Sequence, residues 1–567
     1  MASLIKSISL TNFKGFSEEV RIDLRPITLL FGANSAGKST ILQSLQLVRE
    51  VLEHGSPDVD STLQGGKAVD LGGFRNFVHR HETGRVIEIG FGMELGDESL
   101  PELAGDAFED LSLADAEVWR FHETLNSIRA SVSTLEVKLS MSWSDLRNEA
   151  VVSTYKLGFN NIWCAEISTG ADGRQPRLRM NANHPIFLAD DIEGEALFHE
   201  LADWVLPGQG TEGFRTELGL TADDNGGEKD PEIPPSVLLA VLEIVRAASA
   251  DSPNPGFAAW LHRFKGAIPE LDRQILIPAN SPESAKDIFV LQAFSGFMSW
   301  MLVGPLRLLS EQLEKSRYLG PLRCIPPRGF EASLSRNDAA WSDGMAAWET
   351  LLSSPQEMLE RCSHWMQHAD RLNSGYGLVR TEVQEIDYNT RTPLGRAKPR
   401  IALVDQAGLT HQALDVGVGI SQVLPVVVAA QDDRASIVSI EQPELHVHPA
   451  VQVGLGDLFI DGAIERGLSF LLETHSEHLV LRLLRRIKET TEGSLPDGAS
   501  AVTPDDVNIV YLEKGQDGGV IAHSIGVDAN GKFNDRWPRG FFPERMREAL
   551  PPEVRRRMEA GKAGSVS

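Results

Sequence analysis

The stretch Gly32-Ala-Asn-Ser-Ala-Gly37-Lys38-Ser39 matches the pattern G-x-x-x-x-G-K-[ST] of a phosphate-binding loop. The apolar run 27–31 directly before it predicts a strand. After the loop, apolar residues recur at helical spacing at Ile41, Leu42, Leu45 and Val48. A strand, a glycine-rich loop and a helix in this order are the context in which such a loop binds phosphate.

The residues of this loop have separate roles in the predicted site. The glycines allow backbone N–H groups to surround the β-phosphate at a helix N-terminus, and Lys38 neutralises the β- and γ-oxygens. The hydroxyl of Ser39 ligates Mg²⁺. We therefore predict that ATP and Mg²⁺ are the cofactors and that the loop comprises Gly32, Ala33, Asn34, Ser35, Ala36, Gly37, Lys38, Ser39 and Thr40.

An acidic residue follows a second predicted strand. A P-loop needs an acid at the end of a neighbouring strand to hold the shell of the Mg²⁺ ion. Glu441 follows the apolar run 437–440 and is therefore the predicted metal-shell acid. The alternative is a carboxylate that merely ends a strand.

A glycine-rich stretch, Gly417-Val-Gly419-Ile-Ser421-Gln422, lies just before the Glu441 strand. It is followed by an apolar, helix-like run over 423–430. Alone it is a weak signal, because glycine and serine turns before helices are common. Its position after the P-loop and just before the Glu441 strand makes a functional role more plausible.

The pattern along the chain predicts an α/β fold with an insertion. Strand-like segments occupy the first 31 residues and return at 378–383, 400–404, 436–440 and 468–472, and short apolar runs alternating with helices are typical of a parallel sheet. Between these parts, helical periodicities broken by polar loops predict a mainly helical insertion domain. The expected divisions are 1–95, 96–310, 311–500 and 501–567, the last a small C-terminal domain and tail.

The composition limits partners and location. A formal charge of −26 opposes any general affinity for phosphate backbones, so contact with nucleic acid requires a local patch. Cys164, Cys324 and Cys362 are widely spaced, which suits a reducing compartment, and no signal peptide is recognisable. We expect a cytoplasmic protein. The uncharged stretch 288–306 approaches the length of a membrane span, but polar residues, glycine and proline interrupt it, which favours a buried helix.

The glycine-rich stretch 417–422 stands where ABC-type ATPases place their signature loop, and we call it the signature-like loop. The order of P-loop, long insertion, signature-like loop, acidic strand and His475 resembles the ABC-type ATPase head that SMC, RecF and OLD-family proteins share. Four phrases resemble more narrowly the bacterial AAA-family ATPases that end in a small domain of unknown function. These are Leu10-Thr-Asn12-Phe13-Lys14, Glu441-Gln442-Pro443-Glu444-Leu-His446-Val-His448-Pro449, Thr474-His475-Ser476 and Trp537-Pro-Arg-Gly-Phe-Phe542. The resemblance covers residues 1–95 and 315–548 and leaves the insertion aside.

In that family two heads enclose two ATP molecules. The resemblance therefore implies a homodimer or higher oligomer in which Gly419 and Ser421 of one subunit close on the γ-phosphate held by Lys38 of the other. His475 matches the switch histidine that contacts the γ-phosphate; the alternative is a histidine that only ends a strand. The expected catalytic residues are Lys38, Glu441, Gln442 and His475.

Gln442 departs from the family pattern. ABC-type heads usually follow the metal-shell acid with a glutamate that polarises the attacking water. A neutral amide can orient water but cannot accept its proton, and general-base help is worth about 10²–10⁴ in rate. We therefore expect an ATPase whose hydrolysis is slow. Glu444, two residues after Gln442, is a possible substitute for the missing catalytic glutamate, but the sequence does not fix where its side chain points.

Two further clusters have competing interpretations. His446 and His448 form an H-x-H pair that could share a metal, whereas the resemblance implies contact with the partner subunit. Basic residues gather at Arg482, Arg485, Arg486 and Lys488, and at Arg391, Arg396, Lys398 and Arg400. Such groups are usually a solvated face, and the alternative is a local contact with nucleic acid.

Three functions compete at this point. The first is an ATP-driven dimerising switch that acts through a partner effector, with a nuclease as one option, in bacterial antiphage defence or a DNA transaction. The second is a nucleotide-clamped scaffold with negligible hydrolysis. The third is a RecF-like DNA-repair clamp, for which DNA binding that depends on ATP and on salt is the discriminating observation.

Overall fold

The structure, a computed structural model, describes residues 4–54, 71–96, 98–101, 125–181, 184–187, 264, 266–275, 285–330, 338–516 and 518–538. Its strands are β1 (Ile5–Thr11), β2 (Val20–Asp23), β3 (Ile27–Gly32), β4 (Ile87–Glu94), β5 (Thr134–Ser144), β6 (Glu149–Phe159), β7 (Ile162–Ser168), β8 (Arg177–Met180), β9 (Ser316–Leu319), β10 (Tyr376–Ile386), β11 (Pro393–Asp405), β12 (Thr410–His411), β13 (Ile437–Glu441), β14 (Ser469–Glu473), β15 (Val507–Lys514) and β16 (Val520–Ile525). Its α-helices are α1 (Lys38–His54), α2 (Phe74–Phe77), α8 (Ala285–Leu302), α9 (Gly304–Glu314), α10 (Met345–Ser353), α11 (Gln356–Gln367), α12 (Val418–Ala430), α13 (Pro449–Arg466) and α14 (Glu477–Glu492).

The P-loop strand β3 lies inside a six-stranded sheet of order β16-β15-β3-β14-β13-β9. All neighbours run parallel except β16, which pairs antiparallel at one edge. The strands are short apolar runs because both faces of the sheet are covered. Leu29 and Phe31 face one core and Leu30 faces the other, as expected for side chains that alternate along a strand. The predicted parallel sheet is confirmed.

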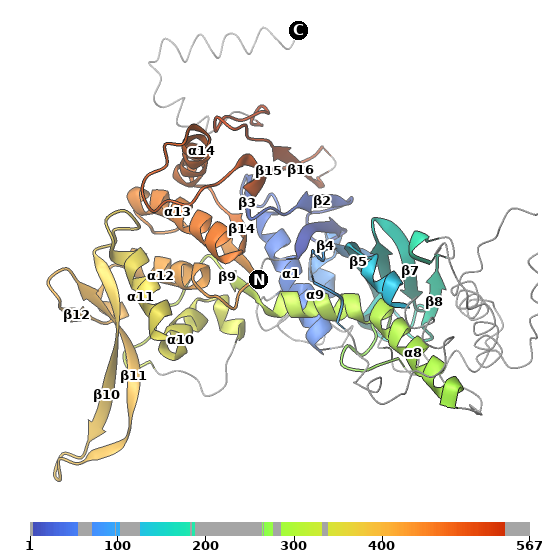
Figure 1. Cartoon of the computed structure of the whole chain (residues 1–567), viewed down its shortest axis with the longest axis horizontal. Coiled ribbons are helices and arrows are strands. Elements are labelled where there is room, and N and C mark those ends of the chain that lie inside the picture. Colours follow the sequence, from blue (N-terminus) through green and yellow to red (C-terminus); the bar gives the residue numbers. More distant parts are fainter. Residues whose placement is uncertain are drawn as a thin grey trace, which may run out of the picture.

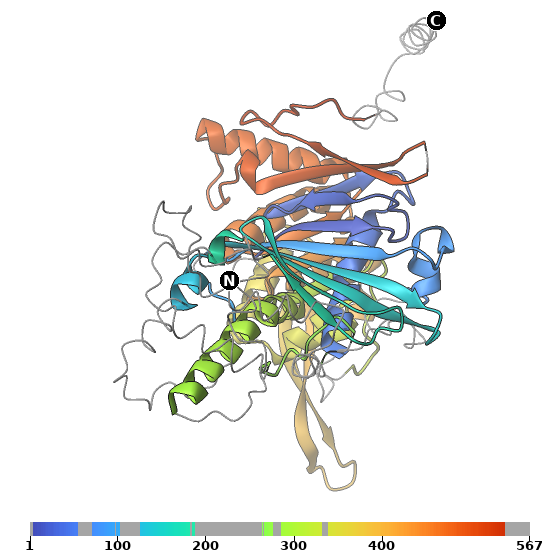
Figure 2. The ribbon, with the colours of Figure 1, turned by 90° about the vertical axis from the view of Figure 1, so that its right-hand side faces the viewer.

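A second, antiparallel sheet covers one side of the P-loop helix. Its order is β2-β1-β4-β5-β6-β7-β8, and Figure 2 shows its long strands beside α8. The apolar face of α1, with Ile41, Leu42, Leu45 and Val48, belongs to the same core as β1 and β4. The predicted strand, loop and helix around the P-loop are therefore confirmed.

The prediction of a mainly helical insertion over 96–310 is wrong for residues 134–180. These residues form β5 to β8, and β5 pairs with β4 across the expected boundary at residue 95. The physical reason is a period of two: Leu135, Val137, Leu139 and Met141 are buried and alternate with more exposed residues along most of β5. The expected helix over 288–306 corresponds to α8 and α9, whereas residues 188–263 of the insertion lie outside the described residues.

The separate C-terminal domain expected from residue 501 is also wrong where the chain is described. β15 pairs parallel with β3 and therefore extends the six-stranded sheet on the side opposite β14. Trp537 packs edge-on against Phe31 of β3, so the segment before residue 539 is anchored on the same sheet. Residues 539–567 lie outside the described part of the chain.

Helices α10 to α14 cover the other face of the parallel sheet (Figure 1). From this layer the hairpin of β10 and β11 projects away from the body; we call residues 376–405 the arm (Figure 1). Its base is buried at Leu378 and Leu403, and its outer half is exposed. Within the described residues, no helix combines the length and apolar character that crossing a bilayer requires.

Candidate nucleotide-binding site

The P-loop turns sharply between β3 and α1. Gly32 has φ +142° and Gly37 has φ +98°, which are backbone conformations that favour glycine. A Cβ atom at Gly32 would come within 2.2 Å of the carbonyl oxygen of Leu512 in β15. The close approach of β15 therefore fixes glycine at the first position of the motif. α1 begins at Lys38, so the N–H groups of its first turn open toward the loop.

Lys38 lies within the cradle of the loop. Its ammonium donates to the carbonyl oxygens of Gly32 and Ala33, each at 3.0 Å. It lies 3.8 Å from the carboxylate of Glu473. Burial lowers the pKa of Lys38, while Glu473, Glu444 and Glu441 oppose that shift. The cation is therefore held where phosphate oxygens would approach it.

Two carboxylates end neighbouring parallel strands beside Ser39. Glu441 of β13 and Glu473 of β14 are paired in register. The Ser39 hydroxyl donates to Glu473 at 2.6 Å, and the Tyr318 hydroxyl donates to Glu441 at 2.6 Å. One hydroxyl and two carboxylates supply hard oxygen ligands, which suit Mg²⁺. The residues present therefore fit an Mg²⁺-nucleotide, with Lys38 and the loop N–H groups for its phosphates.

The acids of this site are electrostatically strained. Burial raises the pKa of Glu441, and repulsion from Glu473 adds to the rise, although the hydrogen bond from Tyr318 opposes it. Burial likewise raises the pKa of Tyr318. Lys14 lies in the same surroundings: it donates to Gln43 at 2.6 Å, and burial lowers its pKa against the attraction of Glu441. A divalent cation would relieve the repulsion between the paired acids.

Glu444 is directed toward the switch-histidine segment. Its carboxylate accepts from the Thr474 hydroxyl at 2.9 Å and from the backbone N–H of His475 at 2.6 Å. Burial raises the pKa of Glu444. His475 is exposed at the end of β14, and partial desolvation together with the charge of Lys38 lowers its pKa. Glu444 thus holds the segment that carries His475.

Gln442 follows Glu441 in a left-handed backbone conformation, with φ 45°. Its backbone N–H donates to the carbonyl oxygen of Glu473 at 2.8 Å, which continues the pairing of β13 with β14 by one residue. The side chain is half-buried. The position expected for a catalytic glutamate therefore lies directly at the end of the acid pair and carries an amide.

The signature-like loop begins α12 and contacts the acidic loop. The backbone of Gly419 lies against His446, since a Cβ atom there would come within 2.6 Å of the His446 carbonyl oxygen. Ser421 is buried, and its hydroxyl donates to the carbonyl oxygen of Ala413 at 3.1 Å. Gly417 is exposed. The described chain thus has Gly417 at its surface, whereas the Ser421 hydroxyl is engaged internally.

Arg323 connects the start of α12 with the end of β13. Its buried guanidinium donates to the Glu441 carbonyl oxygen at 2.7 Å, and the Gln422 amide donates to the Arg323 carbonyl oxygen at 2.5 Å. Burial lowers the pKa of Arg323 to about 10, against the attraction of Glu444 and Glu441. Through Arg323, the first turns of α12 are connected to the end of β13.

Sequence reasoning missed four residues of this site: Lys14, Tyr318, Arg323 and Glu473. A signal existed for Glu473, which ends an apolar run just as Glu441 does. Lys14 belongs to the phrase that carried the family resemblance. Tyr318 and Arg323 reach the site through tertiary packing, and nothing in their local sequence marks them.

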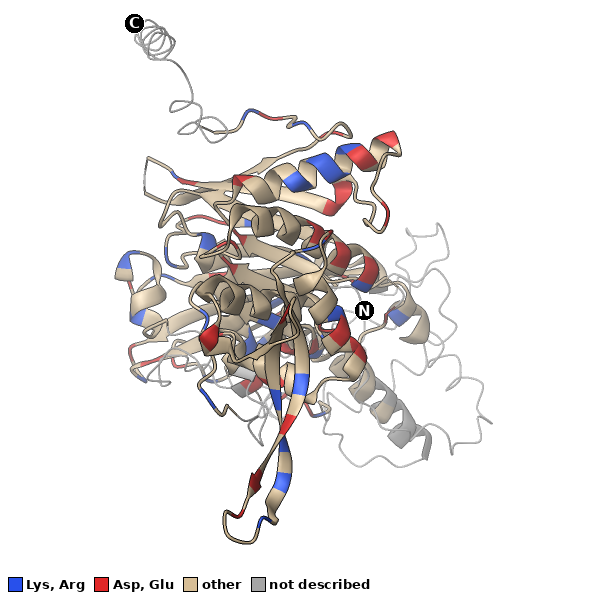
Figure 3. Ribbon diagram, turned by 90° about the vertical axis from the view of Figure 1, so that its left-hand side faces the viewer, with Lys and Arg blue, Asp and Glu red and all other residues tan. Residues whose placement is uncertain are grey.

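His448 and the basic residues of α14 have structural partners. His448 caps α13 by accepting from the backbone N–H of Ala450 at 3.2 Å, and His446 is exposed. The described residues contain no group of three or more His, Cys, Asp or Glu that could hold a metal. On α14 the basic side chains pair with Asp457, Glu489 and Glu492. Figure 3 shows both signs of charge along α14 and the arm, so neither forms a uniformly basic stripe.

Two family models match the chain. One is described as "AAA ATPase domain" and matches residues 4–73, and the other is described as "AAA domain, putative AbiEii toxin, Type IV TA system" and matches residues 310–482. These segments contain the P-loop, the signature-like loop, Glu441 and His475. No curated protein matches the chain.

Solved structures of SMC heads show a distant likeness. They include an SMC head bound to the C-winged helix domain of ScpA, at 10% identity and TM-score 0.38 over 92% of this chain and 97% of that one. An Smc head with a coiled coil and joint from Pyrococcus yayanosii has 11% identity and TM-score 0.37 over 93% and 98%. The SMC head from Thermotoga maritima has 8% identity and TM-score 0.32 over 92% and 99%. These scores are too low to support conclusions about this chain.

Proposed function

We propose that this chain, which carries an AAA-family ATPase domain in two segments, is a dimerising ATP-driven switch. ATP with Mg²⁺ binds at the P-loop, a head dimer closes on it, and hydrolysis reopens the dimer. The observation that carries the proposal is the convergence of Lys38 and Ser39 with Glu441 and Glu473 at one edge of the sheet. Bound Mg²⁺ would supply charge neutralisation at the phosphates.

Hydrolysis by this site is slow in our proposal. The amide of Gln442 can orient a water molecule but cannot take its proton. Glu444 is an alternative base, because burial raises its pKa and it attracts the charge of Lys38. Its carboxylate is engaged by Thr474 and by the backbone of His475, so it acts as a base only after that loop shifts.

In the proposed dimer, Gly419 and Ser421 of one subunit contact the nucleotide that Lys38 of the other subunit binds. The exposed surface of Gly417 and Val418 next to them supports this orientation. The Ser421 hydroxyl must leave the carbonyl of Ala413 to reach a partner's phosphate. Engagement of the two heads therefore requires a local change at the start of α12.

The biological setting follows by analogy only. One of the two matching models is named for a toxin of a toxin–antitoxin system, which favours a role in bacterial defence or a DNA transaction. In this proposal the switch is cytoplasmic and transmits its state to a partner effector, such as a nuclease.

The second candidate is a nucleotide-clamped scaffold that hardly hydrolyses ATP, which the neutral amide of Gln442 favours. For a RecF-like DNA clamp we find less support, because the basic residues of α14 are paired with acids.

A mixing experiment tests the shared site. Lys38→Ala destroys the phosphate contact of one subunit, and Ser421→Ala removes the proposed contact from its partner. If sites are shared between subunits, an equal mixture of two inactive variants forms heterodimers with one intact site and recovers about a quarter of wild-type activity per chain. No recovery, with both variants folded and able to form mixed dimers, contradicts the shared site.

A further inference from the structure

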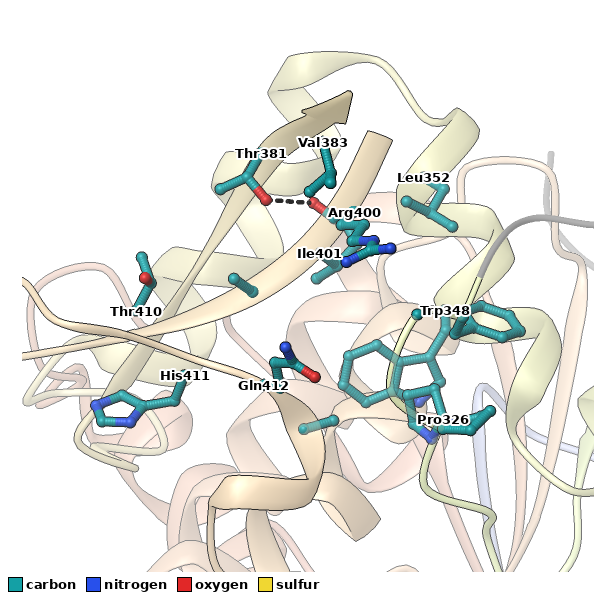
Figure 4. A pocket seen from close by; sticks show the side chains of 15 residues that line it. Pro326, Trp348, Leu352, Thr381, Val383, Arg400, Ile401, Thr410, His411 and Gln412 are labelled. Atoms are coloured by element: carbon teal, nitrogen blue, oxygen red, sulfur yellow. Dashed lines mark hydrogen bonds between the residues drawn. The ribbon is translucent and has the colours of Figure 1, made fainter. Parts of the chain in front are cut away.

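A cavity of about 220 Å³ lies at the base of the arm. Figure 4 shows its lining: Arg400 and Val383 come from the arm, Trp348 and Leu352 from α10, and Gln412 from the segment before α12. Pro326 and Phe330 add further apolar surface. The wall of the cavity is therefore mixed: apolar side chains surround one guanidinium, and polar groups are added by Thr381, Thr410, His411 and Gln412.

Two buried N–H groups of this lining lack an acceptor. They are the Nε of Arg400 and the indole Nε1 of Trp348, neither of which has a hydrogen-bond partner among the described residues. No ion pair of the Arg400 guanidinium occurs in that part of the chain either. Because a buried donor without an acceptor costs free energy, a ligand acceptor that these N–H groups reach after a shift of their side chains is favoured.

We propose that this cavity binds a small apolar monocarboxylate. An apolar cavity of about 150 Å³ holds one benzene ring, so the volume here accommodates one ring with a carboxylate. The single guanidinium neutralises one negative charge, and the buried N–H donors of Arg400 and Trp348 match carboxylate oxygens. A phosphate dianion would leave its second negative charge without compensation beside a single guanidinium, which disfavours it.

The cavity is connected to the signature-like loop. Gln412 and Ala413 belong to its lining, and the carbonyl oxygen of Ala413 accepts the hydrogen bond of Ser421. Arg328 pairs with Asp415 on the same segment, which restrains it further. A bound carboxylate holds this segment in place and keeps Ser421 turned inward, so it opposes ATP-driven dimerisation. This regulatory part rests on the proposed function, whereas binding itself does not.

Calorimetric titration of the full chain without nucleotide tests binding, with benzoate, phenylacetate and isovalerate as probes and benzyl alcohol as the neutral comparison. At least one carboxylate should bind at one site with a Kd of about 1 mM or tighter, as expected for so few atoms. Arg400→Gln should weaken it at least about tenfold, and Lys38→Ala should leave it unchanged. Arg396→Gln, on the exposed outer part of β11, is the matched control and should bind as wild type does.

Several outcomes would overturn the proposal. Binding by none of the three carboxylates rejects the site, and so does binding that Arg400→Gln leaves intact while circular dichroism shows a folded variant. Benzyl alcohol binding as tightly as benzoate rejects a carboxylate ligand. If the carboxylate binds but ATP-dependent dimerisation is unchanged in a wild type that does dimerise with ATP, the regulatory part is rejected.

Discussion

The hydroxyl of Ser39 donates a 2.6 Å hydrogen bond to Glu473, which ends the strand between the P-loop strand and the Glu441 strand. The predicted metal-shell acid, Glu441, is one strand farther away and accepts from Tyr318 instead. Because the carboxyl ends of parallel strands meet at one edge of a sheet, both acids reach the same place. The site therefore depends on a pair of acids where the sequence predicted one.

We expect both acids to be needed for Mg²⁺. Glu473→Gln and Glu441→Gln should each weaken the apparent Mg²⁺ affinity of the ATP complex by about 10–100-fold, because a neutral amide is a poorer ligand for a hard cation. Titration of Mg²⁺ against binding of a fluorescent ATP analogue measures this. Glu492→Gln, an exposed change far along α14, is the control. Wild-type Mg²⁺ affinity in Glu473→Gln would assign the metal to Glu441 alone.

Because the pKa of Glu444 is raised, this residue should make the folded state less stable as pH rises. The folded state binds this proton more tightly than the unfolded state, so ionisation of Glu444 lowers stability as pH rises from the ordinary glutamate value through the raised one. Glu444→Gln removes that loss. Measured from pH 4 to pH 8, the stability of the variant relative to wild type should rise with pH. A flat difference would show that burial does not perturb Glu444.

Two glycines of the signature-like loop give a matched pair. Gly419→Ala places a Cβ atom 2.6 Å from the His446 carbonyl oxygen, whereas a Cβ atom at Gly417 meets nothing within 4 Å. We expect Gly419→Ala to lower the free energy of unfolding by about 1–3 kcal/mol and Gly417→Ala to change it little. Chemical denaturation of both variants checks this. Equal effects would mean that the contact with His446 is loose.

Arg323 should contribute strongly to stability. Replacing it with methionine keeps much of its volume but leaves the backbone carbonyl of Glu441 without its present partner, whereas the bond from the Gln422 amide to the backbone carbonyl of residue 323 can persist. The expected loss is about 3 kcal/mol in the free energy of unfolding. The exposed control Arg396→Met should change stability by less than about 0.5 kcal/mol. A loss in Arg323→Met no larger than in the control would contradict the proposed link between α12 and β13.

Much of the nucleotide site could be predicted because its residues lie close together in the sequence. The P-loop combines a glycine pattern with a strand before it and a helix after it, and all three are local properties of the chain. Glu441 and the strand 437–440 were visible for the same reason. Tyr318 and Arg323 could not be found, because only tertiary packing brings β9 and its following loop against β13.

The insertion shows where local reasoning failed. The pairing of β5 with β6 has a register shift between Ser140 and Met141. At this point of β5 the alternation of buried and more exposed residues is interrupted. Such an irregularity blurs a period of two over a short window. The position of β15 beside β3 could not be read either, since a strand's neighbours in a sheet depend on long-range pairing.

Steady-state ATP hydrolysis with Mg²⁺ is the decisive test of the ATP-driven switch, with wild type compared with Lys38→Ala and Gln442→Glu and the oligomeric state recorded for each. We expect slow wild-type turnover, none in Lys38→Ala, faster turnover in Gln442→Glu, and dimers that form with ATP only when Lys38 is present. Turnover that persists in Lys38→Ala would contradict the account. A wild type that binds ATP but neither hydrolyses it nor dimerises would also contradict the switch.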